Sequence, residues 1–150
     1  MILCLTLIWT LLSTAGALQC QTCTDLQCSN TELQTCSSET MCITASIQAT
    51  SSGTTVPQIY KACASSSLCP ATGAQTFSAN IGVSSAVASA QCCDTDNCNS
   101  DTLNFIPSQS DNSLQCFSCD PDTSECTTPL QCQGVEDNCI QAIGESLLIS

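Results

Sequence analysis

The sequence is poor in positive charge. Its 150 residues include no His and a single Lys or Arg, Lys61, against thirteen Asp and Glu residues, which gives a formal net charge of −12. Binding of nucleic acid requires cations that displace the counterions of the phosphates, and one lysine cannot supply them. The same charge disfavours anionic membrane surfaces. The composition therefore predicts a protein that binds no nucleic acid.

Catalytic motifs are also missing. Without His, the sequence lacks the commonest general base and metal ligand. It contains neither a G-x-S-x-G nucleophile motif nor a phosphate-binding loop. We therefore expect a protein that is not an enzyme and that needs no cofactor.

The chain begins with a short apolar run. Ile2–Leu12 is too short to span a membrane but has the length of a signal-peptide core. The small residues Ala15–Ala17 follow it, as a signal-peptidase site requires. We therefore predict a signal peptide over residues 1–17, a secreted protein and no transmembrane span, with an uncleaved anchor as the alternative.

Residues 18–150 are rich in cysteine and poor in large side chains, with fifteen cysteines and four aromatic residues. Cysteine makes up about 11 % of these residues, above the roughly 8–10 % that marks disulfide scaffolds. So small an apolar core cannot balance the chain entropy without covalent cross-links. The composition predicts an extracellular protein held together by disulfides.

A cysteine pattern occurs twice. Residues 18–23, LQCQTC, return 96 residues later as residues 114–119, LQCFSC. The fifth cysteine of each copy begins a related string, CITA from Cys42 and CIQA from Cys139. The shared order and strings favour an internal duplication. Between the copies, residues 100–113 are polar and free of cysteine, which predicts a linker.

The first copy alternates with the period of β-strands between its cysteines. In residues 42–49, CITASIQA, two faces alternate, and the turn-prone residues 50–54 precede a returning strand at residues 55–63. Pro57 weakens that strand or marks a bulge or an edge. A second hairpin is expected from residues 75–81 and 83–92. No segment carries an apolar stripe of helical period, so the expected fold class is all-β.

The first copy ends in residues 92–99, CCDTDNCN, a C-C-x4-C-N pattern. With the opening L-x-C-x-x-C and ten cysteines in this order, it resembles the urokinase-receptor/lymphocyte-antigen family of three-finger domains. The tandem arrangement is similar to two-domain members such as the gamma-type phospholipase A₂ inhibitors and urokinase-receptor-like proteins. The resemblance implies a small, disulfide-rich, snake-toxin-like fold, with a three-finger domain at residues 18–99 and a partial second one at residues 114–150.

The resemblance also implies a pairing of the cysteines, which spacing alone leaves open among hundreds of alternatives. Applied in order, the family pattern gives the disulfides Cys20–Cys42, Cys23–Cys28, Cys36–Cys63, Cys69–Cys92, Cys93–Cys98, Cys116–Cys139 and Cys119–Cys126. It leaves Cys132 unpaired. It also implies that Asn99 is structural and hydrogen-bonds back to the N-terminal strand.

The unpaired Cys132 makes the second copy incomplete. Either the chain is a fragment of a longer one, or Cys132 pairs between chains. Half of a three-finger domain buries too little apolar area to order itself, which favours a fragment. A lipid-anchor signal requires an apolar tail of roughly 10–20 residues, and residues 147–149 give a run of only three.

Two metal-binding interpretations compete with the disulfide scaffold. The C-x-x-C pairs match zinc or redox motifs, and Asp94 and Asp96 match a calcium site or a carboxylate pair. The complete cysteine pattern and an oxidising compartment favour disulfides. Asp94 and Asp96 lie in a short loop between two cysteines, where aspartate is common because it favours turns. We therefore predict no metal site.

Three-finger domains bind through loops that their disulfides hold in place. The exposed candidates are the turn formed by Thr50, Ser51, Ser52, Gly53 and Thr54, and the stretch Ala64–Leu68. We therefore hypothesise a secreted module that binds an extracellular protein, and a basic secreted phospholipase A₂ suits the −12 charge. The alternatives are a cell-surface receptor or adhesion protein whose lipid-anchored C-terminus lies outside this chain, and a diffusible signalling protein.

Overall fold

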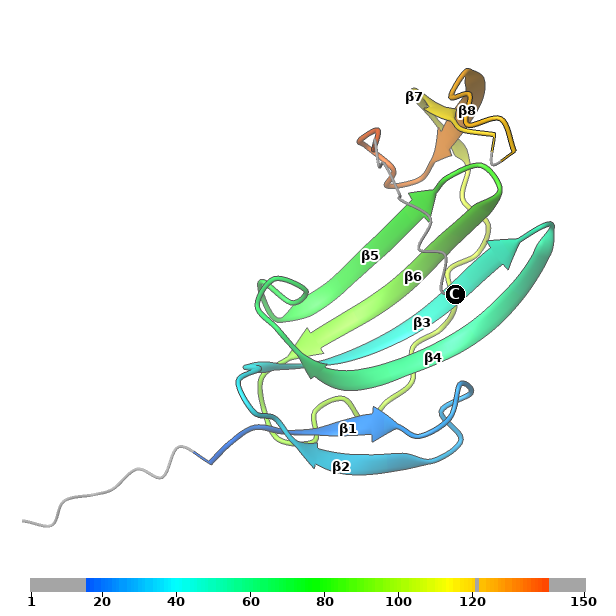
Figure 1. The fold of residues 1–150 in the computed structure, drawn as a ribbon. Coiled ribbons are helices and arrows are strands. Elements are labelled where there is room, and N and C mark those ends of the chain that lie inside the picture. Colours follow the sequence, from blue (N-terminus) through cyan, green and yellow to red (C-terminus); the bar gives the residue numbers. More distant parts are fainter. Residues whose placement is uncertain (1–15, 121, 141–150) are drawn as a thin grey trace, which may run out of the picture.

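The structure, a computed structural model, describes residues 16–120 and 122–140. Most of the predicted signal peptide and the last ten residues of the second copy lie outside this part of the chain. The described residues form eight β-strands in three antiparallel sheets (Figure 1). The strands are β1 (Gln19–Cys23), β2 (Thr31–Thr35), β3 (Met41–Ser51), β4 (Thr54–Ala64), β5 (Gly73–Asn80), β6 (Ser84–Cys93), β7 (Asp111–Ser118) and β8 (Thr128–Gln133). The expected all-β fold class is confirmed.

The largest sheet consists of two hairpins in the order β4-β3-β6-β5. The β3–β4 hairpin, finger two, closes through Ser52 and Gly53, whose φ angles of 49° and 77° suit a tight two-residue turn. The turn is therefore narrower than the expected residues 50–54, since β3 and β4 extend to its base. The β5–β6 hairpin, finger three, turns at Gly82 with a φ of 88°. Pro57 lies in the edge strand β4, a position that tolerates proline.

The interior is built from sulfur and small apolar side chains. One buried cluster on the sheet consists of Ile43, Ala45, Ala64, Cys69, Ala90 and Cys92. A second cluster, of Cys20, Cys36 and Cys42, lies where the fingers meet. The largest fully buried side chains are four cysteines and Ser46. A core this small explains why disulfides must supply much of the stability.

Finger one, formed by β1 and β2, lies beside the outer edge of β4 (Figure 1). The amide of Ile59 in β4 donates to the carbonyl oxygen of Leu26 in the loop of finger one, at 3.5 Å. The Sγ atom of Cys23 lies 3.6 Å from the carbonyl oxygen of Ile59. Finger one thus covers part of the free edge of the sheet, which leaves the finger-two end of that edge open.

The segment that follows the first copy packs on the polar face of the large sheet. Ser46 Oγ donates to the carbonyl oxygen of Leu103 at 2.6 Å, and Ser89 Oγ donates to that of Asn104 at 2.7 Å. In Figure 1 this yellow segment runs from the base of the sheet to β7 at the top. Residues 100–110, which belong to the predicted linker, therefore follow a defined path along the sheet.

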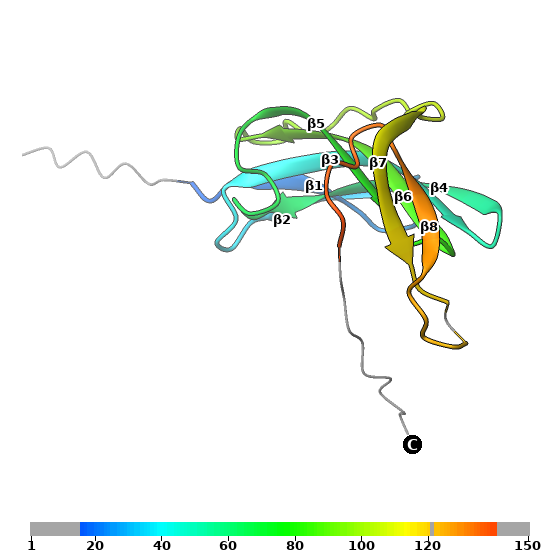
Figure 2. The ribbon, with the colours of Figure 1, turned by 90° about the horizontal axis from the view of Figure 1, so that it is seen from above.

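The second copy repeats the geometry of finger one. Gln115 of β7 pairs with Gln131 of β8, as Gln19 of β1 pairs with Thr35 of β2. Each residue of the second pair lies 96 positions after its counterpart in the first copy, so the two hairpins have the same register. β7 begins at Asp111, inside the range expected as linker, where Asp111 pairs with Gln133 of β8. Asn112 Nδ2 adds bonds to the carbonyl oxygens of Gly134 and Glu136. Figure 2 shows β7 and β8 crossing the end of finger three. The duplication inferred from sequence thus has a structural counterpart.

Candidate binding surfaces

Asn99 joins two sheets at the base of the first copy. Its side chain is 3 % exposed. Oδ1 accepts from the amide of Gln21 at 2.8 Å, and Nδ2 donates to the carbonyl oxygens of Gln21 and Ile43 at 2.8 and 3.1 Å. These bonds link β1 to β3. They also satisfy every polar atom of the buried side-chain amide. The geometry gives Asn99 a structural position rather than one on a binding surface.

The described residues contain seven disulfides, and these join the same pairs that the family resemblance implies. They are Cys20–Cys42, Cys23–Cys28, Cys36–Cys63, Cys69–Cys92, Cys93–Cys98, Cys116–Cys139 and Cys119–Cys126. Cys132 has a free, buried thiol. Its Sγ lies 3.4 Å from that of Cys116, as Cys36 Sγ lies 3.3 Å from that of Cys20. Cys132 therefore occupies the position that Cys36 has in the first copy.

The clustered cysteines and Asp96 have partners within the protein. The sulfur atoms of Cys20, Cys36 and Cys63 lie within 4.8 Å of one another, but each belongs to a disulfide and so offers no thiolate to a metal. Asp96 Oδ1 accepts from the amide of Gln19 at 2.9 Å. The carboxylate of Asp96 thus helps to hold β1 against the loop between Cys93 and Cys98.

The tip of finger two is exposed and polar. Residues 51–54 are exposed, and the hydroxyl groups of Thr50 and Thr55 lie 2.9 Å apart across the hairpin. Ala64, the first residue of the other candidate stretch, is buried, whereas residues 65–68 form an exposed turn that includes Leu68. Neither surface contains Trp, Tyr or Arg, the residues that dominate binding energy in most interfaces.

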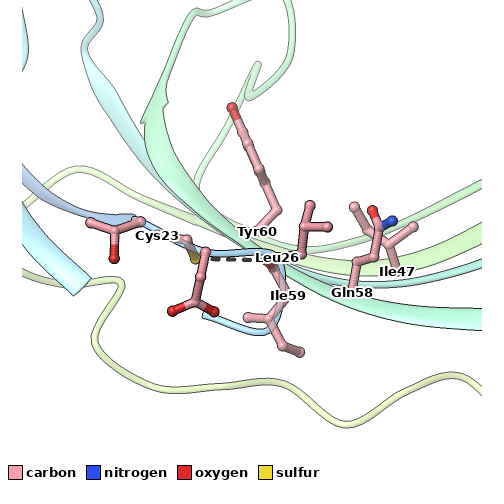
Figure 3. Close-up of a pocket in the computed structure, with 8 residues that line it drawn as sticks. Cys23, Leu26, Ile47, Gln58, Ile59 and Tyr60 are labelled. Atoms are coloured by element: carbon pink, nitrogen blue, oxygen red, sulfur yellow. Dashed lines mark hydrogen bonds between the residues drawn. The ribbon is translucent and has the colours of Figure 1, made fainter. Parts of the chain in front are cut away.

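A cleft with larger side chains lies between finger one and β4. Its volume is about 340 Å³, and it is lined by Cys23, Thr24, Asp25, Leu26, Ile47, Gln58, Ile59 and Tyr60. Figure 3 shows Leu26, Ile59 and Tyr60 around this cleft. Leu26 is 68 % exposed and Tyr60 is 46 % exposed. These two side chains provide the apolar and aromatic anchors that the finger-two tip lacks.

Asp25 supplies negative charge beside this cleft. Its carboxylate accepts from the amides of Gln27, Ser29 and Asn30 at 3.0, 3.0 and 3.1 Å. The amide of Ser29 has the largest effect and lowers the pKa of Asp25 below its usual 3.8; desolvation opposes this shift, and the amides of Asn30 and Gln27 lower the pKa further. The cleft therefore combines apolar walls with a carboxylate that stays ionised in mildly acidic solution.

The only lysine of the sequence is buried. Lys61 is 4 % exposed, and its ammonium group donates to the carbonyl oxygen of Ser100. Burial lowers the pKa of Lys61 from its usual 10.5, and the nearby charge of Asp101 opposes that shift. Over the described residues, therefore, acidic side chains reach the surface while no side-chain cation does. The exposed side-chain charge of this part of the molecule has one sign.

Sequence reasoning missed both the cleft and the burial of Lys61. Leu26 and Tyr60 are 34 residues apart, and only the docking of finger one on β4 brings them together. A signal was nevertheless present, since Tyr60 is one of four aromatic residues after residue 17 and occupies an expected strand. Lys61, the next residue, lies in the same expected strand.

The family model described as the u-PAR/Ly-6 domain matches residues 16–101, which is more than half of the chain. This range contains β1 to β6 and the five disulfides of the first copy. Across the part of the chain that the structure describes, no helix is long and apolar enough to cross a membrane.

Proposed function

The chain belongs to the u-PAR/Ly-6 domain family, and from that premise we propose that it is a secreted protein that binds and inhibits a basic secreted phospholipase A₂. Members of this family are generally non-enzymatic and bind extracellular proteins. The proposal places this chain with the gamma-type phospholipase A₂ inhibitors that its tandem arrangement resembles. Binding, rather than chemistry, is the activity that its exposed surfaces can support.

The single observation that carries the proposal is the burial of Lys61. Because the only lysine is 4 % exposed, its charge is not available to an approaching protein. Twelve Asp and Glu residues lie in the described part of the chain, and most are exposed. A surface of one sign attracts a partner of the opposite sign and repels one of its own. A basic protein is therefore the favoured partner.

The cleft beside finger one is the proposed contact for an apolar side chain of the partner. Leu26 and Tyr60 are large, exposed and line the same cleft, so they are available to contact an apolar side chain of a partner. Asp25 lies beside them with an ionised carboxylate. The cleft thus favours an apolar side chain of the partner that has a positively charged residue next to it in the partner's sequence.

Titration of the purified protein against a basic secreted phospholipase A₂ tests the proposal. We expect loss of phospholipase activity and a complex that weakens as salt rises, because exposed charges are screened. The double variant Leu26→Ala/Tyr60→Ala should weaken binding at least tenfold. Leu33→Ala is the matched control, since Leu33 lies in β2, is 56 % exposed and is not part of the cleft.

Two outcomes would reject the proposal. Absence of both inhibition and a salt-sensitive complex would remove the phospholipase as partner. Equal weakening by Leu33→Ala and by the double variant would remove the cleft as the contact. Secretion is tested separately, by recovery from the culture medium of a chain that begins at Leu18.

A further inference from the structure

Three cysteine sulfur atoms come together in the second copy. Cys116 and Cys139 form a disulfide, and the thiol of Cys132 is free and buried. The Sγ atom of Cys132 lies 3.4 Å from that of Cys116. Atoms that are held about 3–3.5 Å apart can react without a large rearrangement. The free thiol therefore lies within reach of a disulfide bond.

Cys132 and Cys139 differ in exposure. Cys132 is 4 % exposed, whereas Cys139 lies on the surface. A thiol at position 132 is therefore shielded from solvent, while a thiol at position 139 would be open to other molecules. The position of the free thiol thus decides whether this copy can react with its surroundings.

The disulfide is the main connection between residues 137–140 and the β7–β8 hairpin. Glu136 is still bonded to the hairpin, because its carbonyl oxygen accepts from Asn112 Nδ2 at 2.9 Å. Beyond it, no hydrogen bond between described residues joins residues 137–140 to the hairpin. The disulfide sulfur of Cys139, which carries no hydrogen, lies 3.7 Å from the carbonyl oxygen of Gln115. Breaking this disulfide would therefore release a short segment and leave β7 and β8 in place.

Chain entropy hardly distinguishes two alternative pairings of these cysteines. Cys116–Cys139 closes a loop of 23 residues, and Cys116–Cys132 would span 16 residues. The entropic cost of closing a loop changes slowly with its length. To form the new bond, the sulfur atoms of Cys116 and Cys132 must approach each other by about 1.4 Å, from 3.4 Å to the usual disulfide length. Both pairings are therefore open to this copy.

The first copy has the same arrangement without a free thiol. Cys36 Sγ lies 3.3 Å from the Sγ of Cys20, which is bonded to Cys42. Cys36 is itself bonded to Cys63 and so has no thiol to exchange. Cys42, the counterpart of Cys139, is fully buried. The first copy is therefore an internal control in which exchange is blocked.

We propose that Cys116–Cys139 and Cys116–Cys132 interconvert by thiol–disulfide exchange, and that Cys139 thereby becomes a site for a mixed disulfide with a small disulfide molecule. In the exchange, the sulfur of Cys132 gives up its proton and bonds to the sulfur of Cys116. The Cys116–Cys139 bond breaks, and its electron pair leaves with the sulfur of Cys139, which takes up a proton. This step consumes no oxidant and no reductant.

The exposed thiol of Cys139 then reacts with the small disulfide. Its sulfur gives up a proton and bonds to one sulfur of that molecule, while the other sulfur leaves with the electron pair and takes up a proton. The mixed disulfide holds the second copy in the Cys116–Cys132 form. None of the three cysteines lines the cleft beside finger one, so the proposal does not depend on inhibition of a phospholipase.

Labelling of the purified, disulfide-bonded chain with N-ethylmaleimide under native conditions tests this exchange. We expect at least tenfold more label at Cys139 than at Cys132, together with a Cys116–Cys132 linkage in the peptide map. Digestion with pepsin at about pH 2 prevents further exchange, because the reactive thiolate form is absent there. Oxidised glutathione, used in place of the maleimide, should add one glutathionyl group, also at Cys139.

Two variants separate exchange from other sources of a free thiol. Cys132→Ala removes the attacking sulfur, so Cys139 should keep its disulfide and take no label. Cys139→Ala leaves Cys116 and Cys132 without other partners among the described residues, and they should pair with each other in an oxidising buffer. In the unmodified chain, Cys42 should stay unlabelled, because Cys36 is bonded to Cys63.

Four results would overturn the proposal. Label at Cys132 beside an intact Cys116–Cys139 bond would show that local opening exposes the thiol without exchange. Label that appears only after unfolding in guanidinium chloride would show that the thiol stays at Cys132. Equal label at Cys139 in the unmodified chain and in Cys132→Ala would show that Cys139 is unpaired without any exchange. Failure of Cys116 and Cys132 to pair in Cys139→Ala would show that the new bond cannot form. None of these results bears on the phospholipase assay, so the two proposals fail independently.

Discussion

At the scale of single residues, Asn99 links two strands from a buried position. Its amide holds Gln21 of β1 and Ile43 of β3 with three hydrogen bonds. Asn99→Ala would leave one buried N–H and two carbonyl groups without these partners. We expect it to lower the free energy of unfolding by about 3 kcal/mol.

Unfolding by guanidinium chloride with the disulfides intact measures this loss. Asn104→Ala is the control, because Asn104 is exposed and only its backbone carbonyl takes part in a hydrogen bond. Its effect should stay within about 0.5 kcal/mol. A similar loss in both variants would contradict the role of Asn99.

Lys61 makes stability depend on pH in the alkaline range. Burial holds the pKa of Lys61 below its usual 10.5. Between the folded pKa and 10.5, the unfolded chain therefore binds the proton more strongly than the folded chain does. The free energy of unfolding should rise with pH over that interval. Lys61→Met removes the titrating group, and its stability should lack this rise.

Both proteins should carry Cys132→Ala, so that its free sulfur cannot exchange with the disulfides. Lys61→Met should also be similar in stability to the parent at neutral pH, or more stable. A buried charge that is replaced by an apolar chain of similar length loses its desolvation penalty together with its hydrogen bond. A parallel alkaline rise in both proteins would show that another group causes it.

At the scale of elements, the loop of finger one is organised by a single carboxylate. Asp25 accepts from the amides of Ser29, Asn30 and Gln27, and these bonds lower its pKa below 3.8. A depressed pKa means that the carboxylate stabilises the loop at pH values above 3.8. That contribution disappears as the pH falls through the folded pKa.

The carboxyl ¹³C signal of Asp25 and the amide signals of Ser29 and Asn30 report this titration by NMR. We expect them to change together, with a midpoint below 3.8. In Asp25→Asn the two amide signals should lose that midpoint. A midpoint at or above 3.8 in the unmodified protein would contradict the hydrogen-bond arrangement of the loop.

At the scale of the whole molecule, the connecting segment determines how the two copies are joined. Ser46 and Ser89 hold the backbone at Leu103 and Asn104 against the large sheet. In Ser46→Ala/Ser89→Ala we expect the ¹H–¹⁵N heteronuclear NOE of residues 101–106 to fall while that of the sheet stays unchanged. Loss of both hydroxyls should free the segment beyond Ser100, whose carbonyl oxygen still accepts a hydrogen bond from Lys61.

The double variant Ser65→Ala/Ser67→Ala provides a matched control for this change. These hydroxyls bond to each other at 2.7 Å in an exposed turn and do not contact the segment. Their removal should leave residues 101–106 as they are. An unchanged NOE in Ser46→Ala/Ser89→Ala would mean that the segment is held by other contacts.

Local patterns determined the strands and the hairpins of this protein. Residues 42–49 alternate with period two because a strand places successive side chains on opposite faces, and β3 has its buried Ile43 and Ala45 on one of them. Gly53 and Gly82 mark turns because their positive φ angles suit glycine. The order of the cysteines, together with the family resemblance, likewise gave a pairing that satisfies the geometry of the fold.

Only the tertiary structure decided which segments cover each face of the large sheet. Lys61 is buried because residues 99–104 return over the polar side of the sheet, and Ser46 meets Leu103 across 57 positions of sequence. The cleft at Leu26 and Tyr60 forms in the same way, from segments far apart in the chain. Local alternation reports that a side chain points to a given face of its strand. Whether water or another segment lies on that face depends on long-range packing, which neighbouring residues do not encode.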